Sequence, residues 1–218
     1  AQWRHVGIYF DMLIFTNVTR ELMASHNYSL DVLHEHNKRV FASLSQKPKT
    51  VQGRLQPKIL IANSDAEHFT QYFEHIADIK RSYSVAKKSD YRATRIETSA
   101  RGAEFIINKH SYHIPIPGAI NVSNAAGAIA AALELGKSPQ VIAHGLNELG
   151  VIPGRMERIE AGQKFHVIVD YAHEETGMQA LMDSAQDMVQ KGNKIITLLG
   201  AEGGGRDELK RPIMGEIA

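Results

Sequence analysis

The stretch "KILIANSDAEHF", residues 58–69, joins an apolar run to a polar turn and then to the start of a helical pattern. Ile59 to Ala62 is predicted to be a buried strand, because a short uninterrupted apolar run is typical of a strand covered on both faces. Ser64 or Asp65 is then expected to cap a helix that runs through Phe73. A strand followed directly by a helix favours an α/β fold.

The same alternation occurs upstream and downstream of this stretch. Met12 to Phe15 is a second expected strand, and "SLDVLHEHNKRVFASL" after it places its apolar side chains on one helical face. "AAGAIAAALELG" predicts an alanine-rich helix ending at Gly136, and "SPQVIAHGLNEL" predicts a short helix with Ser138 as its cap. Between Ile79 and Pro117 the sequence alternates and is broken at Gly102, which is typical of antiparallel hairpins.

A second α/β segment begins after "GVIPGRMERI", residues 150–159, where Gly and Pro interrupt the pattern. "KFHVIVDYAH" is expected to be a continuous strand, "TGMQALMDSAQDMVQKG" a helix closed by Gly192, and "KIITLLG" the next strand. Strand, helix and strand in this order predict a right-handed βαβ unit. We therefore place a domain boundary near Pro153, with one domain over 1–152 and another over 153–218.

The composition is ordinary for a globular protein. The 218 residues are 43% hydrophobic and 22% charged, and the net charge of +1 hides no block of like charges that would favour nucleic acid or a membrane surface as partner. Without cysteine, neither a disulfide nor a thiolate metal site can form, which fits a reducing compartment. No signal-like segment or membrane-spanning apolar run is found, so we expect a cytoplasmic protein; the composition does not indicate an oligomeric state.

Polar residues follow both expected strands of the second α/β segment. Asp170, Tyr171 and His173 end the first strand, and residues 200–206 end the second. The carboxyl ends of parallel strands share one edge of a sheet, where ligands bind. Glycines let backbone N–H groups approach a ligand, and Arg206 could hold a carboxylate or phosphate. In the alternative interpretation Asp170 only caps the next helix and the glycines only form a turn.

Several motifs taken together resemble a known family. "PGRMERIEAG", "VIVDYAH" and "GAEGGGRDELKRPIMGEIA" resemble successive motifs of the C-terminal domain of the Mur ligases, closest to the branch that adds the third amino acid to UDP-N-acetylmuramoyl dipeptide. "FDMLIFTNVTRE", "ILIANSDAEHF" and "IPIPGAINVSNAAGAIAAALELG" resemble stretches of the family's central ATPase domain. The resemblance implies the C-terminal part of that central domain, followed by the start of a Rossmann-like C-terminal domain.

The resemblance also implies a reaction. Mur ligases form an amide with ATP and Mg²⁺: a substrate carboxylate becomes an acyl phosphate, and an incoming amine displaces the phosphate. The implied substrates are a UDP-N-acetylmuramoyl dipeptide and a diamino acid, lysine or diaminopimelate. Two alternatives stay open: a degenerate relative that acts as a binding or regulatory module, and a sister ligase of the folylpolyglutamate or cyanophycin type.

Four residues are assigned to the nucleotide site by the resemblance. Asn124 of "NVSN" would contact the adenine, Arg155 of "GRME" and Asp170 of "DYAH" would contact the ribose region, and His173 would order the site as a catalytic group. Asn124 could instead cap the alanine-rich helix, and Arg155 could be only an interdomain ion-pair partner.

Two cations are assigned to the amine-bearing substrate in the same way. Arg206 would bind the carboxylate of the incoming amino acid, and Lys210 would support that rim. The alternative for Arg206 is a solvated salt bridge with Asp207 or Glu208. The run of glycines before Arg206 differs from the commoner family pattern, which has an acidic residue directly before the Arg-Asp pair.

The expected central domain departs from the family at its metal site. Leu22 stands where the family has a histidine that helps to hold magnesium, so no residue is assigned to a metal here. Lys38 is our candidate for the lysine that the family carbamylates, although a second alignment places Asn37 there and an ordinary solvated lysine is the alternative. His34 and His36 are expected on different helix faces, as surface histidines.

The phosphate loop G-x-x-x-x-G-K-[ST] is missing from this sequence. Its nearest match, "AAALELGKS", has Ala131 at the first glycine position and closes a helix instead of following a strand. In the resembled family this loop and the UDP-binding domain lie upstream. We therefore expect a piece of a longer ligase that is inactive alone.

Overall fold

The computed structural model describes residues 6–19, 29–45, 47–190, 192–200 and 208–218. The chain divides into two compact units. The first unit comprises Ala1–Ala93 and Asn124–Ser138, and the second comprises Thr94–Ser123 and Pro139–Ala218. These units interleave along the chain, and the boundary between residues 152 and 153 stays a prediction.

The first unit is built on a parallel sheet with the strand order β1-β4-β5-β6. Its strands are β1 (Met12–Phe15), β4 (Ile59–Asn63), β5 (Ile79–Ser84) and β6 (Tyr91–Arg92). Every residue of β4 is buried, as its apolar run predicts for a central strand with neighbours on both sides. Phe15 lies opposite Ala62, and Asn63 opposite Tyr83, so the carboxyl ends of these strands meet at one edge.

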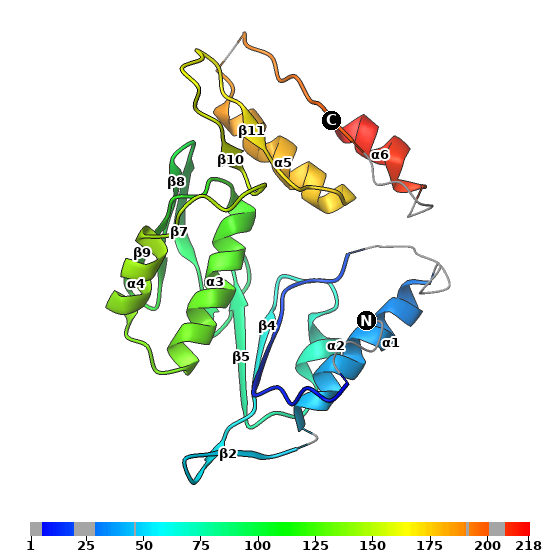
Figure 1. Ribbon diagram of the computed structural model, residues 1–218, viewed down its shortest axis with the longest axis vertical. Coiled ribbons are helices and arrows are strands. Elements are labelled where there is room, and N and C mark those ends of the chain that lie inside the picture. The colour runs from blue at the N-terminus through cyan, green and yellow to red at the C-terminus, as the bar shows by residue number, and fades with distance from the viewer. Residues whose placement is uncertain (1–5, 20–28, 46, 191, 201–207) are drawn as a thin grey trace. The chain divides into compact units, whose positions relative to one another are not determined.

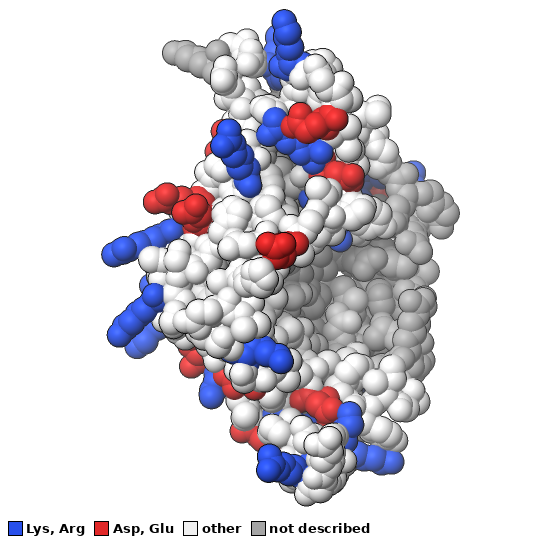
Figure 2. Space-filling view, turned by 60° about the vertical axis from the view of Figure 1, so that its left-hand side comes forward, with Lys and Arg blue, Asp and Glu red and all other residues white. Residues whose placement is uncertain are grey.

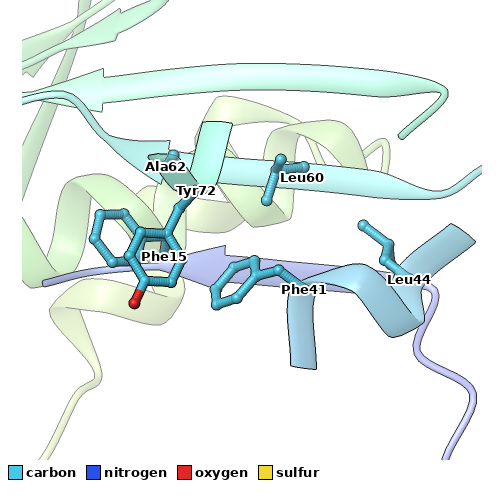
Figure 3. Close-up of a cluster of buried hydrophobic side chains, with 6 residues drawn as sticks. All are labelled: Phe15, Phe41, Leu44, Leu60, Ala62 and Tyr72. Atoms are coloured by element: carbon cyan, nitrogen blue, oxygen red, sulfur yellow. The ribbon is translucent and has the colours of Figure 1, made fainter. Parts of the chain in front are cut away.

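One face of this sheet is covered by two helices, α1 (Leu30–Ala42) and α2 (Phe69–Phe73). Their apolar side chains join those of the sheet in one buried cluster, shown in Figure 3: Phe15, Phe41, Leu44, Leu60, Ala62 and Tyr72. The Phe15 and Tyr72 rings stack with centroids 4.0 Å apart. A 3-10 turn (Ser43–Ser45) follows α1, and a small hairpin, β2 (Lys49–Val51) with β3 (Arg54–Gln56), precedes β4.

The opposite face of the sheet contacts α3 (Ala119–Glu134), which lies across β5 from α2 in Figure 1. Gly127 allows the close approach, because a Cβ there would come within 3.0 Å of the Tyr83 ring. Glu134 accepts hydrogen bonds from Arg81 Nε at 2.6 Å and from the Tyr91 hydroxyl at 2.5 Å. The helix ends as predicted, with Gly136 at a φ of +76° and its N–H bonded to the carbonyl of Leu133.

The predicted antiparallel region between Ile79 and Pro117 is only partly correct. β5 pairs in parallel with β4, and the antiparallel part is confined to β7 (Thr94–Ser99), β8 (Gly102–Ile107) and β9 (His110–Ile114) in the second unit. The alternating pattern of β5 did not reveal that its partner is the buried strand β4. Asn108 and Lys109 turn β8 into β9 with φ values of 49° and 70°, a conformation typical of two-residue hairpin turns.

The remaining elements of the second unit are α4 (Pro139–Asn147), β10 (Glu157–Arg158), β11 (Ile168–Val169), α5 (Glu175–Met188) and α6 (Lys210–Ile217). α4 begins directly after Ser138, and α5 covers most of the helix expected there. The expected continuous strand over 164–173 is reduced to β11, which pairs antiparallel with β10.

The expected strand over 194–200 is wrong, because none of the described residues pairs with it in a sheet. Ile196 is 94% exposed and Leu198 is fully exposed, so its apolar side chains are not covered. The predicted βαβ unit is therefore absent from the described part of the chain. A strand requires a hydrogen-bonded neighbour, and apolar sequence alone does not supply one.

Charged side chains of both signs are interspersed on the face drawn in Figure 2. This distribution agrees with the small net charge of +1. Within the described ranges, no helix is long and apolar enough to cross a membrane.

Candidate functional site

Asp170 joins two motif segments that lie apart in the sequence. Its Oδ2 accepts the backbone N–H of Met156 at 2.7 Å, and its Oδ1 accepts that of Ala172 at 2.8 Å. The N–H of Tyr171 also bonds to the carbonyl of Gly154 at 2.7 Å. Asp170 follows β11, as predicted, and it fixes the "GRME" segment against the "DYAH" segment.

Arg155 lies at the surface beside Asp170. Its guanidinium is 5.5 Å from the centroid of the Tyr171 ring, within the range of a cation–π contact. Arg155 makes no ion pair with any residue that the structure describes, and both its assignment to the ribose region and its alternative as an interdomain ion-pair partner stay predictions.

His173 extends the same group of side chains. Its Nδ1 lies 3.0 Å from the carbonyl oxygen of Tyr171, and its ring centroid lies 4.8 Å from that of Tyr171. A carbonyl oxygen only accepts, so this hydrogen bond places the proton on Nδ1. Nε2 is then left facing Glu174 Oε1 at 3.6 Å.

A cavity of about 660 Å³ lies beside these residues in the second unit. Asp170 and Ala172 line one part of it, apolar side chains of α5 such as Met178 line another, and residues 164–166 and 193–200 also contribute to the lining. The volume falls within the usual range of small-molecule sites. The carboxylate of Asp170 thus borders an open space.

Lys210, predicted to support a substrate rim, is buried. It is the first residue of α6, and its Nζ lies 2.9 Å from Glu174 Oε1. Its cation is thus paired with a carboxylate of the protein itself. Sequence reasoning missed Glu174, because nothing in the pattern of α5 indicates a partner in α6.

Two predicted residues lie in the first unit. Lys38 is half-buried on α1 and pairs with Glu35 Oε1 at 3.0 Å; the hydrogen bond from Lys38 holds the pKa of Glu35 below its usual range. Asn124 is exposed within α3, which begins at Ala119, so the alternative that it caps this helix is wrong. Arg206 and Leu22 lie outside the described residues.

Asp65 does not cap α2, which corrects the prediction from the sequence. Its carboxylate accepts hydrogen bonds from Ser84 Oγ at 2.6 Å and from the backbone N–H groups of residues 85–87 at 2.7–3.4 Å. Burial opposes ionisation, but these hydrogen bonds outweigh it and hold the pKa of Asp65 below its usual range. Asp65 therefore ties the ends of β4 and β5 together.

His34 is buried, which contradicts the expectation of a surface histidine. Only 4% of it is exposed, its Nδ1 lies 3.1 Å from the Tyr72 hydroxyl, and the His68 ring centroid is 4.0 Å away. Burial, with help from His68 and Lys38, lowers the pKa of His34. In the described ranges no three His, Asp or Glu side chains gather as metal ligands.

Comparisons with known proteins place both halves of the chain. Residues 1–132 match the Mur ligase middle domain, and residues 154–218 match the Mur ligase glutamate ligase domain. Two relatives named UDP-N-acetylmuramoyl-L-alanyl-D-glutamate–2,6-diaminopimelate ligase are similar: that of Clostridium tetani is 35% identical over 89% of this chain, and that of Solibacter usitatus is 32% identical over 97%. The chain spans 44% and 41% of these relatives, less than half of their length.

Solved structures agree with these matches. One similar structure is that of a UDP-N-acetylmuramoyl-L-alanyl-D-glutamate–2,6-diaminopimelate ligase. The match covers 100% of this chain and 43% of the ligase chain, at 25% identity and a TM-score of 0.67. MurF from Acinetobacter baumannii shares the fold, with a TM-score of 0.69 at 20% identity. That match covers 82% of this chain and 38% of the MurF chain. The chain therefore belongs to the Mur ligase family and carries parts of its central ATPase and C-terminal domains.

Proposed function

We propose that the protein containing this chain is an ATP-dependent ligase that adds the third amino acid to UDP-N-acetylmuramoyl-L-alanyl-D-glutamate. The two relatives of 32–35% identity are named for this dipeptide and for 2,6-diaminopimelate, which makes diaminopimelate the first amino acid to test and lysine the second. The observation that carries the proposal is the Asp170 carboxylate, which holds the segments of Arg155 and His173 together through the N–H groups of Met156 and Ala172, while Asp170 itself lines a cavity.

The residues of this place fit the ribose of a nucleotide. Each oxygen of Asp170 accepts one backbone N–H and keeps a lone pair for a hydroxyl, and Arg155 has no carboxylate partner among the described residues. Asn124, on an exposed position of α3, is proposed to contact the adenine. We assign Arg155 and Asp170 to the ribose region.

The reaction follows from the chemistry of an acyl phosphate. The carboxylate of the dipeptide attacks the γ-phosphorus of ATP, ADP leaves, and an acyl phosphate forms. The amine of the amino acid then attacks the acyl carbon, phosphate leaves with the bonding electrons, and the amine loses a proton. Mg²⁺ would neutralise the phosphate oxygens, but no described side-chain cluster fits it as a ligand set, and none is assigned.

His173, Arg206 and Lys38 receive proposed roles in this scheme. His173 is proposed to order the nucleotide site as a catalytic group, with its Nδ1–H bonded to the Tyr171 carbonyl. Arg206 is proposed to bind the carboxylate of the incoming amino acid, and Lys38 to be the lysine that is carbamylated. Both nucleotide substrates belong to the cytoplasm, which is the proposed location.

Phosphate release by the full-length protein tests the proposal. We expect release that requires ATP, the UDP-muramoyl dipeptide and an amino acid together. The full-length protein is used because this chain contains no phosphate loop of its own. Asp170→Asn should raise the KM for ATP by roughly 10-fold to 100-fold, because an amide cannot accept both backbone N–H groups. Asp187→Asn, an exposed change on α5, is the matched control. Absence of phosphate release with both diaminopimelate and lysine would refute the proposal.

A further inference from the structure

A buried ion pair connects α5 and α6 within the second unit. Lys210 Nζ lies 2.9 Å from Glu174 Oε1, and the two side chains are only 6% and 15% exposed. Glu174 is the residue directly before α5, and Lys210 is the first residue of α6. The pair therefore joins the N-terminal ends of two helices that are separate in the sequence.

The placement of Lys210 is electrostatically unfavourable for its own helix. The N-terminus of a helix carries partial positive charge, so a cation in the first turn of α6 is repelled, whereas a carboxylate before α5 is favoured. Glu174 supplies the negative charge that compensates Lys210. Glu174 Oε2 is buried and has no hydrogen-bond partner among the described residues, whereas Oε1 accepts a hydrogen bond from Lys210 Nζ.

A buried pair of this kind fixes geometry more than it adds stability. Desolvation of two charges offsets much of their attraction, so well-packed apolar residues often serve as well or better where only stability is needed. Glu174 follows His173 directly, and its Oε1 is 3.6 Å from His173 Nε2. Whatever holds Glu174 also holds the end of the loop that carries Asp170 and His173.

We infer that Glu174 and Lys210 are a positioning pair, which holds the loop of residues 170–174 in place through α6. The inference rests on the proposed ligase function, in which this loop faces the nucleotide. Lys210 then acts through Glu174 and does not touch substrate, which replaces the role that the sequence suggested for it. Glu174 is a positioning residue that the sequence motifs do not indicate.

Steady-state kinetics of the full-length protein test the pair. Glu174→Gln and Lys210→Met should each lower kcat/KM for ATP on the order of 10-fold to 100-fold, mainly through KM, with the KM for the muramoyl dipeptide unchanged. The double variant should be no worse than either single variant, because both break one contact. Lys210→Arg, which keeps the charge, should recover most of the loss. Glu175→Gln is the matched control, since Glu175 is the neighbouring carboxylate and its side chain makes no hydrogen bond or ion pair with the described residues.

A second readout separates this inference from the proposed function. The imidazole nitrogen resonances of His173, measured by NMR without substrates, should shift in Glu174→Gln and in Lys210→Met but not in Glu175→Gln. Absence of ligase activity in the unmodified protein would refute the proposed function, and the His173 resonances would still decide the pair. Variants that lower only the unfolding midpoint, with unchanged His173 resonances and unchanged kinetics where activity exists, would overturn the inference.

Discussion

Two apolar runs of this chain, β4 (Ile59–Asn63) and residues 194–200, have similar sequences but differ in structure and burial. β4 is buried throughout and lies between β1 and β5 in a parallel sheet. Residues 194–200 form no strand, and Ile196 and Leu198 stand almost wholly in solvent. Both runs follow the pattern expected of a buried strand.

The difference lies in the neighbours that each run finds. β4 has hydrogen-bonding partners on both sides, and Asp65 ties its carboxyl end to the loop after β5. Residues 194–200 have no sheet partner among the described residues, and the neighbouring β11 pairs with β10. The hydrophobic pattern thus indicates that a segment can be buried as a strand. Whether it is buried depends on hydrogen bonding with a neighbouring strand.

The largest expected effect is at the centre of β4. Leu60→Ala should lower the free energy of unfolding by about 2–5 kcal/mol, because Leu60 is fully buried in the cluster around Phe15 and Tyr72. Urea unfolding measures this change. A loss below about 1 kcal/mol would mean that β4 is no better packed than an exposed segment.

Removal of the carboxylate at the end of β4 should have the next largest effect. Asp65→Ala should cost about 1–3 kcal/mol, because it leaves the N–H groups of residues 85–87 without their acceptor. Since the folded-state pKa is lowered, this contribution is present above pH ~4 and is lost as the pH falls through the folded pKa. Glu67→Ala, an exposed change nearby, is the control; equal losses in both variants would contradict the role of Asp65.

A smaller effect on stability is expected from a change of pH, through two histidines close to β4. Burial lowers the pKa of His34 and of His75, so the folded state binds fewer protons than the unfolded state below pH ~6.5. Stability should therefore fall as the pH drops from ~6.5 towards the folded pKa values, by at most about 1.4 kcal/mol per pH unit for each histidine.

Unfolding curves at several pH values check this dependence on His34. His34→Gln should reduce the slope of the free energy of unfolding against pH, whereas substitution of the exposed His110 should leave that slope unchanged. Identical slopes in the unmodified protein and in His34→Gln would show that His34 does not contribute.

The smallest effect is expected in residues 194–200. Leu198→Ala makes the same chemical change as Leu60→Ala but should alter the free energy of unfolding by no more than about 0.5 kcal/mol, because Leu198 is fully exposed. Hydrogen exchange provides a second measure: backbone amides of 59–63 should exchange slowly and those of 194–200 rapidly. A loss above about 2 kcal/mol for Leu198→Ala would mean that this run is buried after all.

Much of the local structure was predictable from the sequence. β1 and β4 lie where their apolar runs are, α3 ends before Gly136, and α4 begins after Ser138. The position of Asp170 at the end of a strand was also predictable. These features depend on periodicity, capping and glycine conformation within short windows, and a single segment carries that information.

The candidate site was predictable as a set of motifs, but its contacts were not. The motif order indicated Asp170, Arg155 and His173, whereas the partner of Lys210 and the anchoring role of Glu174 depend on which helix ends meet. Likewise, helical periodicity left His34 at the surface, although contacts with Tyr72 and His68 bury it.

The sequence by itself determined the family, the α/β class and the positions of β1, β4 and the longer helices. Only the tertiary structure decided which apolar run is paired, which carboxylate holds β4 to β5, and which lysine is buried. The physical reason is that propensities act over neighbouring residues, whereas burial and hydrogen-bond partners are settled between segments far apart in the chain.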